Sequence, residues 1–153
     1  MRTIVVGYDA SDAAKRALDR AADLAEALSA RLVVVSVSAP PVPAPAPIPE
    51  PTGSMLAPGG GMTPLGAPEP DPKELAQRRL EEARARLASR PLDADYVAEA
   101  GPPAERLLAV ADERDAELVV VGSRDHGLLE RLITPPVEEA VARRAERDVL
   151  MVH

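Results

Sequence analysis

Apolar residues in the first forty positions of the chain follow two different periods. Residues 3–8 and 32–37 form short runs rich in β-branched side chains, which is typical of strands buried on both faces. Between them, apolar residues recur every three or four positions and predict a long amphipathic helix, for which Ser11 is the expected N-cap. The buried face of this helix should be narrow and rich in small side chains: Ala14, Ala17, Leu18, Ala21, Leu24, Ala25 and Leu28.

A second helix is predicted to begin near residue 71, where Asp71 is a suitable N-cap and Pro72 suits the first helical position. Its buried face should carry Ala76, Leu80, Ala83 and Leu87. Residues 92–100 then alternate between apolar and mostly acidic side chains, so one face of this third strand is expected to be wet. A strand with one wet face belongs at or near the edge of a sheet.

The last third of the chain continues this pattern. A helix is predicted after the turn at Gly101, a strand at residues 118–121, a final helix that opens at Pro135 and Pro136, and a fifth strand at residues 148–153. The side chains expected to face inward are Ala104, Leu107, Leu108 and Ala111 in the first helix, and Val137, Ala140, Val141 and Ala145 in the second. On the final helix, Arg143, Arg144 and Arg147 are expected to pair with glutamates one turn away.

Five strands joined by crossovers that each contain a helix predict an α/β protein. The expected architecture is an open five-stranded parallel sheet with helices on both faces. In such sheets a ligand binds beyond the C-terminal ends of the strands, where the strand order reverses. The segments expected at that place are residues 7–9, 37–38 and 122–127.

Residues 39–71 interrupt the pattern as a Pro/Gly-rich loop insertion. Eleven prolines fall in this segment, and prolines at alternate positions favour polyproline II over a sheet ladder. A loop of this length within a compact domain is uncommon. One interpretation is a mobile surface excursion that folding does not need. The other is a docking segment for a protein partner, or a lid over a site.

With 153 residues the chain has the size of a single domain, and its composition excludes several kinds of site. A net charge of −7 and an aromatic content of 1% argue against nucleic acid as a partner, because phosphates are repelled and bases find no stacking platforms. With no cysteine and two histidines, the sequence indicates no metal site. No segment resembles a membrane span or a signal peptide, so a cytoplasmic location without a membrane partner is expected.

Five segments of the chain, taken in order, resemble one known family. They are IVVGYDASDAAKRAL at residues 4–18, the pair Ser36-Val37, the turn Gly101-Pro102, AELVVVGSRDHGLLERL at residues 116–132, and DVLMVH at residues 148–153. Together they resemble a universal stress protein over residues 1–153, with the loop insertion as the one unmatched part. The resemblance implies a single Rossmann-like domain with strand order 3-2-1-4-5 and a role as a stress-response or regulatory module.

The resemblance also implies a homodimer that pairs through the fifth strand. Val149, Leu150, Met151 and Val152 form an apolar edge with no central charge or proline. Such an edge favours pairing with a second copy of the same chain.

Many universal stress proteins bind ATP through Gly-x-x-Gly, nine further residues and then Gly-Ser or Gly-Thr, where backbone N–H groups contact phosphate. Gly122 matches the first glycine, but Asp125 stands at the second, and Pro135 and Pro136 stand at the Gly-Ser pair. A carboxylate repels a triphosphate and two prolines remove two N–H donors, so the affinity should fall on the order of a hundredfold or more. The prediction is a module that binds no ATP in the family manner, needs no cofactor and is not an enzyme.

The alternative is an adenine-nucleotide-binding universal stress protein, an ATP, ADP or AMP switch or slow nucleotidase with a remodelled phosphate loop. Asp9 stands where the family has an aspartate near adenine or ribose, and Val37 matches the family's backbone contact to adenine. The other candidate cofactor-binding residues are Gly122, Ser123, Arg124 and Gly127. For Asp9, a turn between strand and helix is the simpler explanation. No catalytic residues are assigned, because Ser123, Asp125 and His126 are sequence neighbours and a triad is assembled from distant positions.

Overall fold

Strands and helices alternate as expected in the computed structural model, which describes residues 2–39, 70–123, 141–142 and 145–153. The strands are β1 (Thr3–Gly7), β2 (Arg31–Ser38), β3 (Ala94–Ala100), β4 (Leu118–Gly122) and β5 (Asp148–Val152). The helices are α1 (Asp12–Leu28), α2 (Pro72–Leu87) and α3 (Pro103–Glu113). Residues 141 and 142 are also helical and fall within the predicted final helix, whose start lies outside the described residues.

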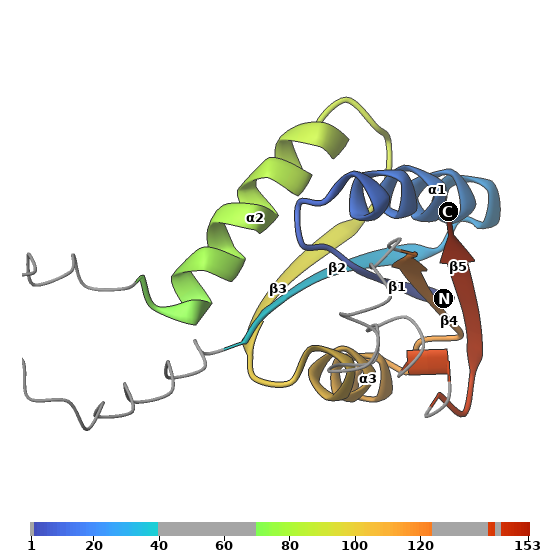
Figure 1. The fold of residues 1–153 in the computed structure, drawn as a ribbon. Coiled ribbons are helices and arrows are strands. Elements are labelled where there is room, and N and C mark those ends of the chain that lie inside the picture. Colours follow the sequence, from blue (N-terminus) through green and yellow to red (C-terminus); the bar gives the residue numbers. More distant parts are fainter. Residues whose placement is uncertain (1, 40–69, 124–140, 143–144) are drawn as a thin grey trace, which may run out of the picture.

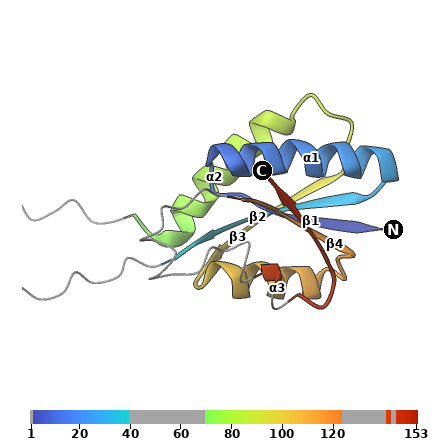
Figure 2. The same cartoon turned by 45° about the vertical axis from the view of Figure 1, so that its right-hand side comes forward.

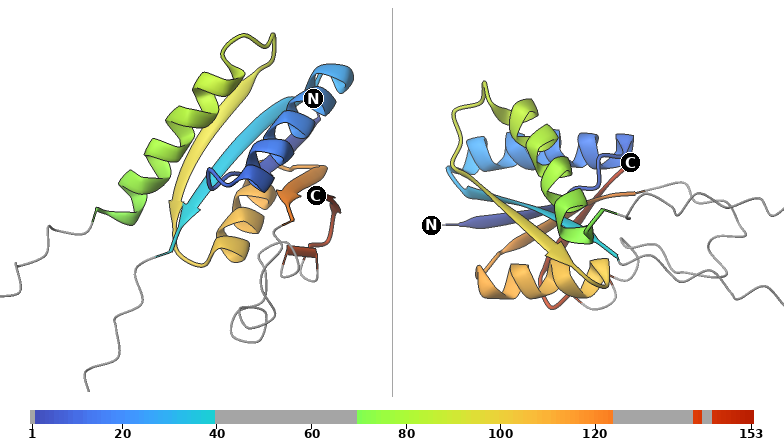
Figure 3. Two further views of the ribbon diagram at one scale, coloured as in Figure 1. Left: turned by 45° about the horizontal axis from the view of Figure 1, so that its top comes forward. Right: turned by 90° about the vertical axis from the view of Figure 1, so that its left-hand side faces the viewer.

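The five strands form one parallel sheet in the order β3-β2-β1-β4-β5 (Figure 1). The predicted fold class and strand order are therefore confirmed. Helices α1 and α2 cover one face of the sheet and α3 lies on the other (Figure 2). β3 and β5 lie at opposite margins of the sheet, so each has one edge without a neighbouring strand in the part of the chain that the structure describes (Figure 3).

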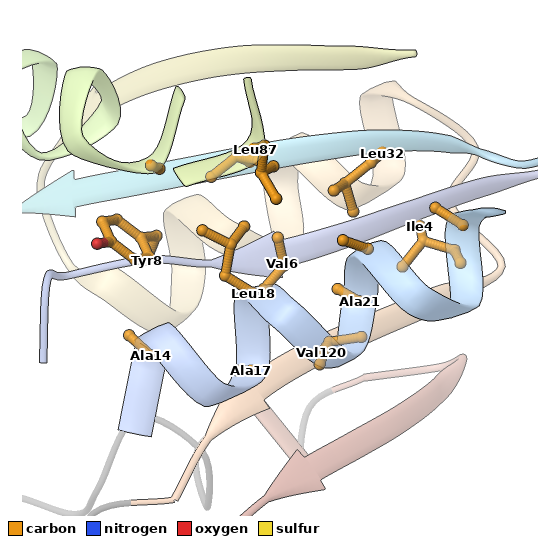
Figure 4. Close-up of a cluster of buried hydrophobic side chains, with 14 of the residues drawn as sticks. Ile4, Val6, Tyr8, Ala14, Ala17, Leu18, Ala21, Leu32, Leu87 and Val120 are labelled. Carbon is orange, nitrogen blue, oxygen red and sulfur yellow. The ribbon is translucent and has the colours of Figure 1, made fainter. Parts of the chain in front are cut away.

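Buried side chains form a cluster on each face of the sheet. Figure 4 shows the cluster that α1 and α2 make with β1, β2 and β4. Alanines supply most of the α1 contribution, and their small size lets the helix backbone lie close to the strands. The cluster on the opposite face joins Val5, Val33 and Val119 of the sheet to Leu107 of α3 and to Val141.

The predicted helix starts are confirmed in atomic detail. The Ser11 hydroxyl accepts a hydrogen bond from the Ala14 amide at 3.2 Å, and the Asp71 carboxylate accepts one from the Lys73 amide at 2.9 Å. All four predicted core positions of α2 are buried. Leu28 does not follow the prediction, because its side chain is 45% exposed in the last turn of α1. Periodicity identifies the buried face of a helix, but not the turn at which the helix extends beyond the residues it packs against.

Three ion pairs join α1 to α2 and to the turn that follows α2. They are Lys15 with Glu82 at 3.2 Å and Asp19 with Arg86 at 2.6 Å, both between the helices, and Glu26 with Arg90 of the turn at 2.6 Å. Hydrogen bonds from the Arg86 guanidinium hold the pKa of Asp19 below its usual value. Each exposed ion pair contributes little to stability, so these pairs fix the placement of α2 against α1 more than they stabilise the fold.

The outer face of β3 is less wet than its alternating sequence suggests. Val97 packs against the cluster beneath α3. Glu99 accepts a hydrogen bond from Arg106 at 2.7 Å, and Asp95 accepts one from Arg114 at 3.0 Å. The side chains of both acids stay partly exposed, 24% at Glu99 and 41% at Asp95. The predicted edge position of β3 is therefore confirmed, and its acidic face is partly covered by α3 and partly exposed.

Arg147 does not lie on the final helix, as the sequence suggested. It occupies a bend just before β5. Its guanidinium contacts Ala111, Asp112 and Ala116. The predicted place of this arginine on the final helix is therefore wrong, and the expected partners Glu138 and Glu139 lie outside the described residues.

Several predictions fall outside the described residues. They concern residues 40–69 of the loop insertion, with its partner or lid role, and the motif positions Arg124, Asp125, Gly127, Pro135 and Pro136. Within the part that is described, no helix is long and apolar enough to cross a membrane.

Ser36 of β2 is a buried polar residue that should reduce stability. Its side chain is fully buried, and its hydroxyl has no hydrogen-bond partner among the described residues. A buried hydroxyl without a partner costs about 1 kcal/mol or more. We therefore expect Ser36→Ala to raise the free energy of unfolding by about 1 kcal/mol in urea denaturation. The control is Ser38→Ala, at the buried end of the same strand, whose hydroxyl is not orphaned in this way. A loss of stability in Ser36→Ala equal to that in the control would contradict this reading of Ser36.

Candidate functional site

The C-terminal ends of β1, β2 and β4 lie side by side in the sheet. They bring the predicted candidates Asp9, Val37, Gly122 and Ser123 to one edge. Between β1 and β4 the strand order reverses, and this is where open α/β sheets bind ligands. The four predicted residues that the structure describes therefore lie at the same edge of the sheet.

Asp9 shapes the turn between β1 and α1. Its carboxylate accepts a hydrogen bond from the Ser11 amide at 2.9 Å. The residue between them, Ala10, has a φ of 66°, in the left-handed region that favours glycine. The structural role expected for Asp9 as a turn residue is therefore confirmed. Strained backbone of this kind is frequent at binding sites.

Val37 presents its main chain to the same edge. Along β2, Leu32 and Ser38 bond to the side of β3, whereas Arg31 and Val35 bond to the side of β1. Because alternate residues of a strand point their N–H and C=O groups to opposite neighbours, those of Val37 point toward β1. The β1 register ends at Gly7, opposite Val35, so Val37 lies beyond the last paired residue. The β1 ladder therefore does not use the N–H and C=O groups of Val37.

Gly122 is packed against the first turn of α1. A Cβ atom built on it would lie 2.5 Å from the Ala13 carbonyl carbon, 2.6 Å from the Ala13 oxygen and 2.8 Å from the Ala14 nitrogen. These are backbone atoms, which cannot rotate away. The glycine is therefore required by the contact between β4 and α1, whether or not a phosphate binds.

Ser123, the next residue, has its amide in the sheet. Its N–H donates a hydrogen bond to the Val152 carbonyl at 2.8 Å. In a phosphate loop such amides point at the ligand. Here the Ser123 N–H extends the pairing between β4 and β5 instead.

Tyr8 is a residue of this region that the sequence did not single out. Its side chain is only 2% exposed, and its hydroxyl donates a hydrogen bond to the Glu82 carboxylate at 3.0 Å. Burial, with the nearby Glu82 carboxylate, raises the pKa of Tyr8 to about 12. The two residues are 74 positions apart, so no local pattern could have revealed the pair.

The shifted pKa of Tyr8 predicts a loss of stability at high pH. The folded value of about 12 lies above the ordinary value of 10, so the contribution of Tyr8 is complete below pH 10 and is lost between pH 10 and 12. We expect Tyr8→Phe to be less stable than the wild type at neutral pH by about 1 kcal/mol, through loss of the Glu82 bond. The difference should shrink or reverse above pH 10, as urea denaturation at the two pH values will show.

The direct measurement of the Tyr8 pKa uses Tyr96→Phe, which leaves Tyr8 as the sole tyrosine of the chain. Ultraviolet absorbance of the phenolate should give a midpoint near 12. A midpoint at the ordinary value would contradict the burial argument.

The described part of the candidate site holds no cluster of metal ligands. Among the described residues, no group of three or more His, Cys, Asp or Glu side chains is placed to hold a metal ion. The structure brings Asp9, Val37, Gly122 and Ser123 together, whereas Arg124 and Gly127 lie outside the described residues.

Comparisons with known proteins agree on one family. The model of the Universal stress protein family matches residues 1–153. Universal stress protein Rv1636 of Mycobacterium tuberculosis is 34% identical, covering 99% of this chain and 96% of its own. Stress response protein NhaX of Bacillus subtilis is 31% identical, with 97% and 96% covered. A crystal structure of a universal stress protein in complex with cAMP is 31% identical, with a TM-score of 0.68 over 99% of this chain and 96% of that one.

The whole-chain match, the relatives above 30% identity and the strand order lead to one conclusion. This chain belongs to the universal stress protein family.

Proposed function

We propose that this protein is a cytoplasmic, homodimeric regulatory module of the stress response that does not hold ATP through the family's phosphate loop. The observation that carries the proposal is the use of the first loop residues by the fold itself. Gly122 fills the contact with α1, and the Ser123 N–H is bonded to Val152. The sequence adds a carboxylate at Asp125 and prolines at 135 and 136, which weaken phosphate binding further.

The homodimer is supported by the contrast between the two edges of the sheet. At the β3 edge, Asp95 and Glu99 carry charge next to the free strand, a feature that discourages pairing. β5 has no charge after Asp148. The Val152 carbonyl points to β4, so the main-chain groups of Val149 and Met151 point outward, to the unpaired side. β5 is therefore the edge that a second copy would extend.

Binding of an adenosine monophosphate is the second candidate function. Asp9 and the main chain of Val37 retain the end of the site at which the family holds base and ribose. A relative of 31% identity has been solved in complex with cAMP. The single charge of a cyclic phosphodiester demands far fewer N–H donors than a triphosphate. A site that retains the residues for base and ribose but offers few N–H donors to phosphate suits such a ligand.

Calorimetric titration of protein purified without added ligand tests the nucleotide proposal. We expect no binding of Mg-ATP up to millimolar concentration, and a micromolar Kd for ATP would overturn the proposal. Cyclic AMP and AMP are titrated alongside. Binding of either that weakens about tenfold in Asp9→Asn supports the second candidate, because this variant keeps the turn acceptor for Ser11 but removes the charge.

Sedimentation equilibrium tests the dimer. Met151→Lys places a charge on the β5 edge and should give a monomer. Leu28→Lys is the matched control, because Leu28 and Met151 have side chains of similar exposure, 45% and 44%. A monomeric wild type, or a dimer that tolerates Met151→Lys but not Leu28→Lys, would contradict pairing through β5.

A further inference from the structure

Arg147 joins the segment before β5 to residues 111–116, which lie 31 to 36 positions earlier in the sequence. Its Nη1 donates hydrogen bonds to the carbonyls of Ala111 at 2.9 Å and Ala116 at 2.7 Å, and its Nη2 contacts the Asp112 carboxylate. The guanidinium is mostly covered, with 21% of the side chain exposed. Arginine presents donors in a rigid fork, so it can hold two carbonyls in a fixed geometry.

The carbonyls that Arg147 contacts lie at and just beyond the end of α3. The last carbonyls of a helix have no partner within the helix and carry the negative end of its dipole. Ala111 O accepts a further hydrogen bond from the Ala116 amide at 2.9 Å, in a turn where Asp115 has a φ of 48°. Arg147 therefore completes a C-cap for α3 from a separate segment of the chain.

The same contact lies at the start of the β4·β5 pair. Ala116 precedes β4 by two residues, Arg147 precedes β5 by one, and the register of the two strands begins with Leu118 opposite Asp148. β5 is the last strand in the sheet order, and among the described residues it pairs with β4 alone. A slip of one residue would move every side chain of β5 to the opposite face. A bond that fixes Arg147 to Ala116 opposes that slip.

We propose that Arg147 is a positioning residue that holds β5 in register on β4 and thereby sets the outward edge, with the main chains of Val149 and Met151, for a second copy of the chain. This inference rests on the proposed homodimer for its consequence, but the placement of β5 is a property of each protomer. Its two parts can therefore be measured separately.

Hydrogen exchange of the backbone amides tests the placement of β5. In Arg147→Ala we expect exchange at Leu150, Val152 and Ala116 to be about tenfold to a hundredfold faster, with α1 amides unchanged. The same comparison in the Met151→Lys background removes any protection that a dimer gives. Asp112→Asn keeps both carbonyl bonds and should leave these rates within about twofold of the wild type, because a carboxylate that is 68% exposed contributes little to an ion pair.

Sedimentation gives the second readout. Arg147→Ala should raise the dimer Kd about tenfold or more, and Arg147→Lys, which keeps the charge but not the fork, should fall between it and the wild type. Leu80→Ala, a core change in α2 on the other face of the sheet, controls for lower global stability and should leave the Kd unchanged.

Failure of the proposed homodimer and failure of the positioning role of Arg147 give different results. If the wild type is monomeric, the proposed dimer is wrong, and β5 exchange still decides the role of Arg147. If the wild type is dimeric and Arg147→Ala leaves both β5 exchange and the Kd unchanged, the positioning role is wrong. The role is also overturned if Asp112→Asn has as large an effect as Arg147→Ala, or if Leu80→Ala raises the Kd equally. Should Arg147→Ala fail to fold, Arg147→Lys carries the same comparison.

Discussion

Gly122→Ala is expected to lower the free energy of unfolding by about 3 kcal/mol. The added Cβ would lie 2.5 Å from the Ala13 carbonyl carbon and 2.6 Å from its oxygen, well inside contact distance. Because these atoms belong to the first turn of α1, the clash is relieved only if the helix moves away from β4. That movement would open the alanine-rich contact on which one of the two buried clusters depends. Urea denaturation followed by circular dichroism measures the loss.

Gly7→Ala is the matched control, since Gly7 is the glycine at the end of β1. Its added Cβ would come no closer than 3.3 Å, and there it would meet the flexible end of the Leu107 side chain. We expect a cost below about 1.5 kcal/mol. If Gly122→Ala is as stable as Gly7→Ala but has lost binding of a nucleotide, Gly122 serves a ligand rather than the fold. Because its contact with α1 already requires a glycine, Gly122 is weak evidence for a phosphate loop.

Local patterns predicted most of the fold. Ser11 and Asp71 were identifiable as N-caps because the preferences of capping residues act over three positions. The four core residues of α2 followed from helical spacing alone, since that helix packs on the sheet along its whole length. The strand order came from the resemblance, because alternation of strands and helices restricts topology without choosing one order.

The features that sequence reasoning missed depend on contacts between distant segments. Leu28 has the spacing of a core residue but lies at a helix end that the cluster does not enclose. The sequence predicts Arg147 to be a surface arginine, but in the structure it caps a helix more than thirty residues away. Tyr8 precedes the candidate Asp9, yet its partner Glu82 lies on α2. No period within one element encodes such pairs.

The candidate site was predictable as a location and less so as chemistry. Asp9, Val37, Gly122 and Ser123 meet where the parallel sheet requires them to meet. The directions in which their backbone N–H and C=O groups point could not be predicted from the sequence. The Val37 main chain lies beyond the β1 ladder, whereas the Ser123 N–H is bonded to Val152. The sheet thus already uses the first amide of the phosphate end, but its β1 ladder does not use the main chain of Val37.

Restoring the family motif is expected to have the largest effect on nucleotide binding. In the triple variant Asp125→Gly, Pro135→Gly and Pro136→Ser, we expect the affinity for Mg-ATP to rise a hundredfold or more. The change removes a carboxylate that repels phosphate, returns two N–H donors and adds a hydroxyl. Asp9 and Val37 need no alteration, because both already match the family's residues at the base end.

Partial variants separate the contributions, and calorimetry measures each. Asp125→Gly removes the repulsion alone, and the pair Pro135→Gly and Pro136→Ser restores the donors alone, so each should recover part of the gain. Cyclic AMP is the matched ligand, and its affinity should change by less than that of ATP because its phosphate carries less charge. A triple variant that still ignores ATP would mean that the loss lies elsewhere. The Ser123 amide, which the sheet already uses, would then be the first place to look.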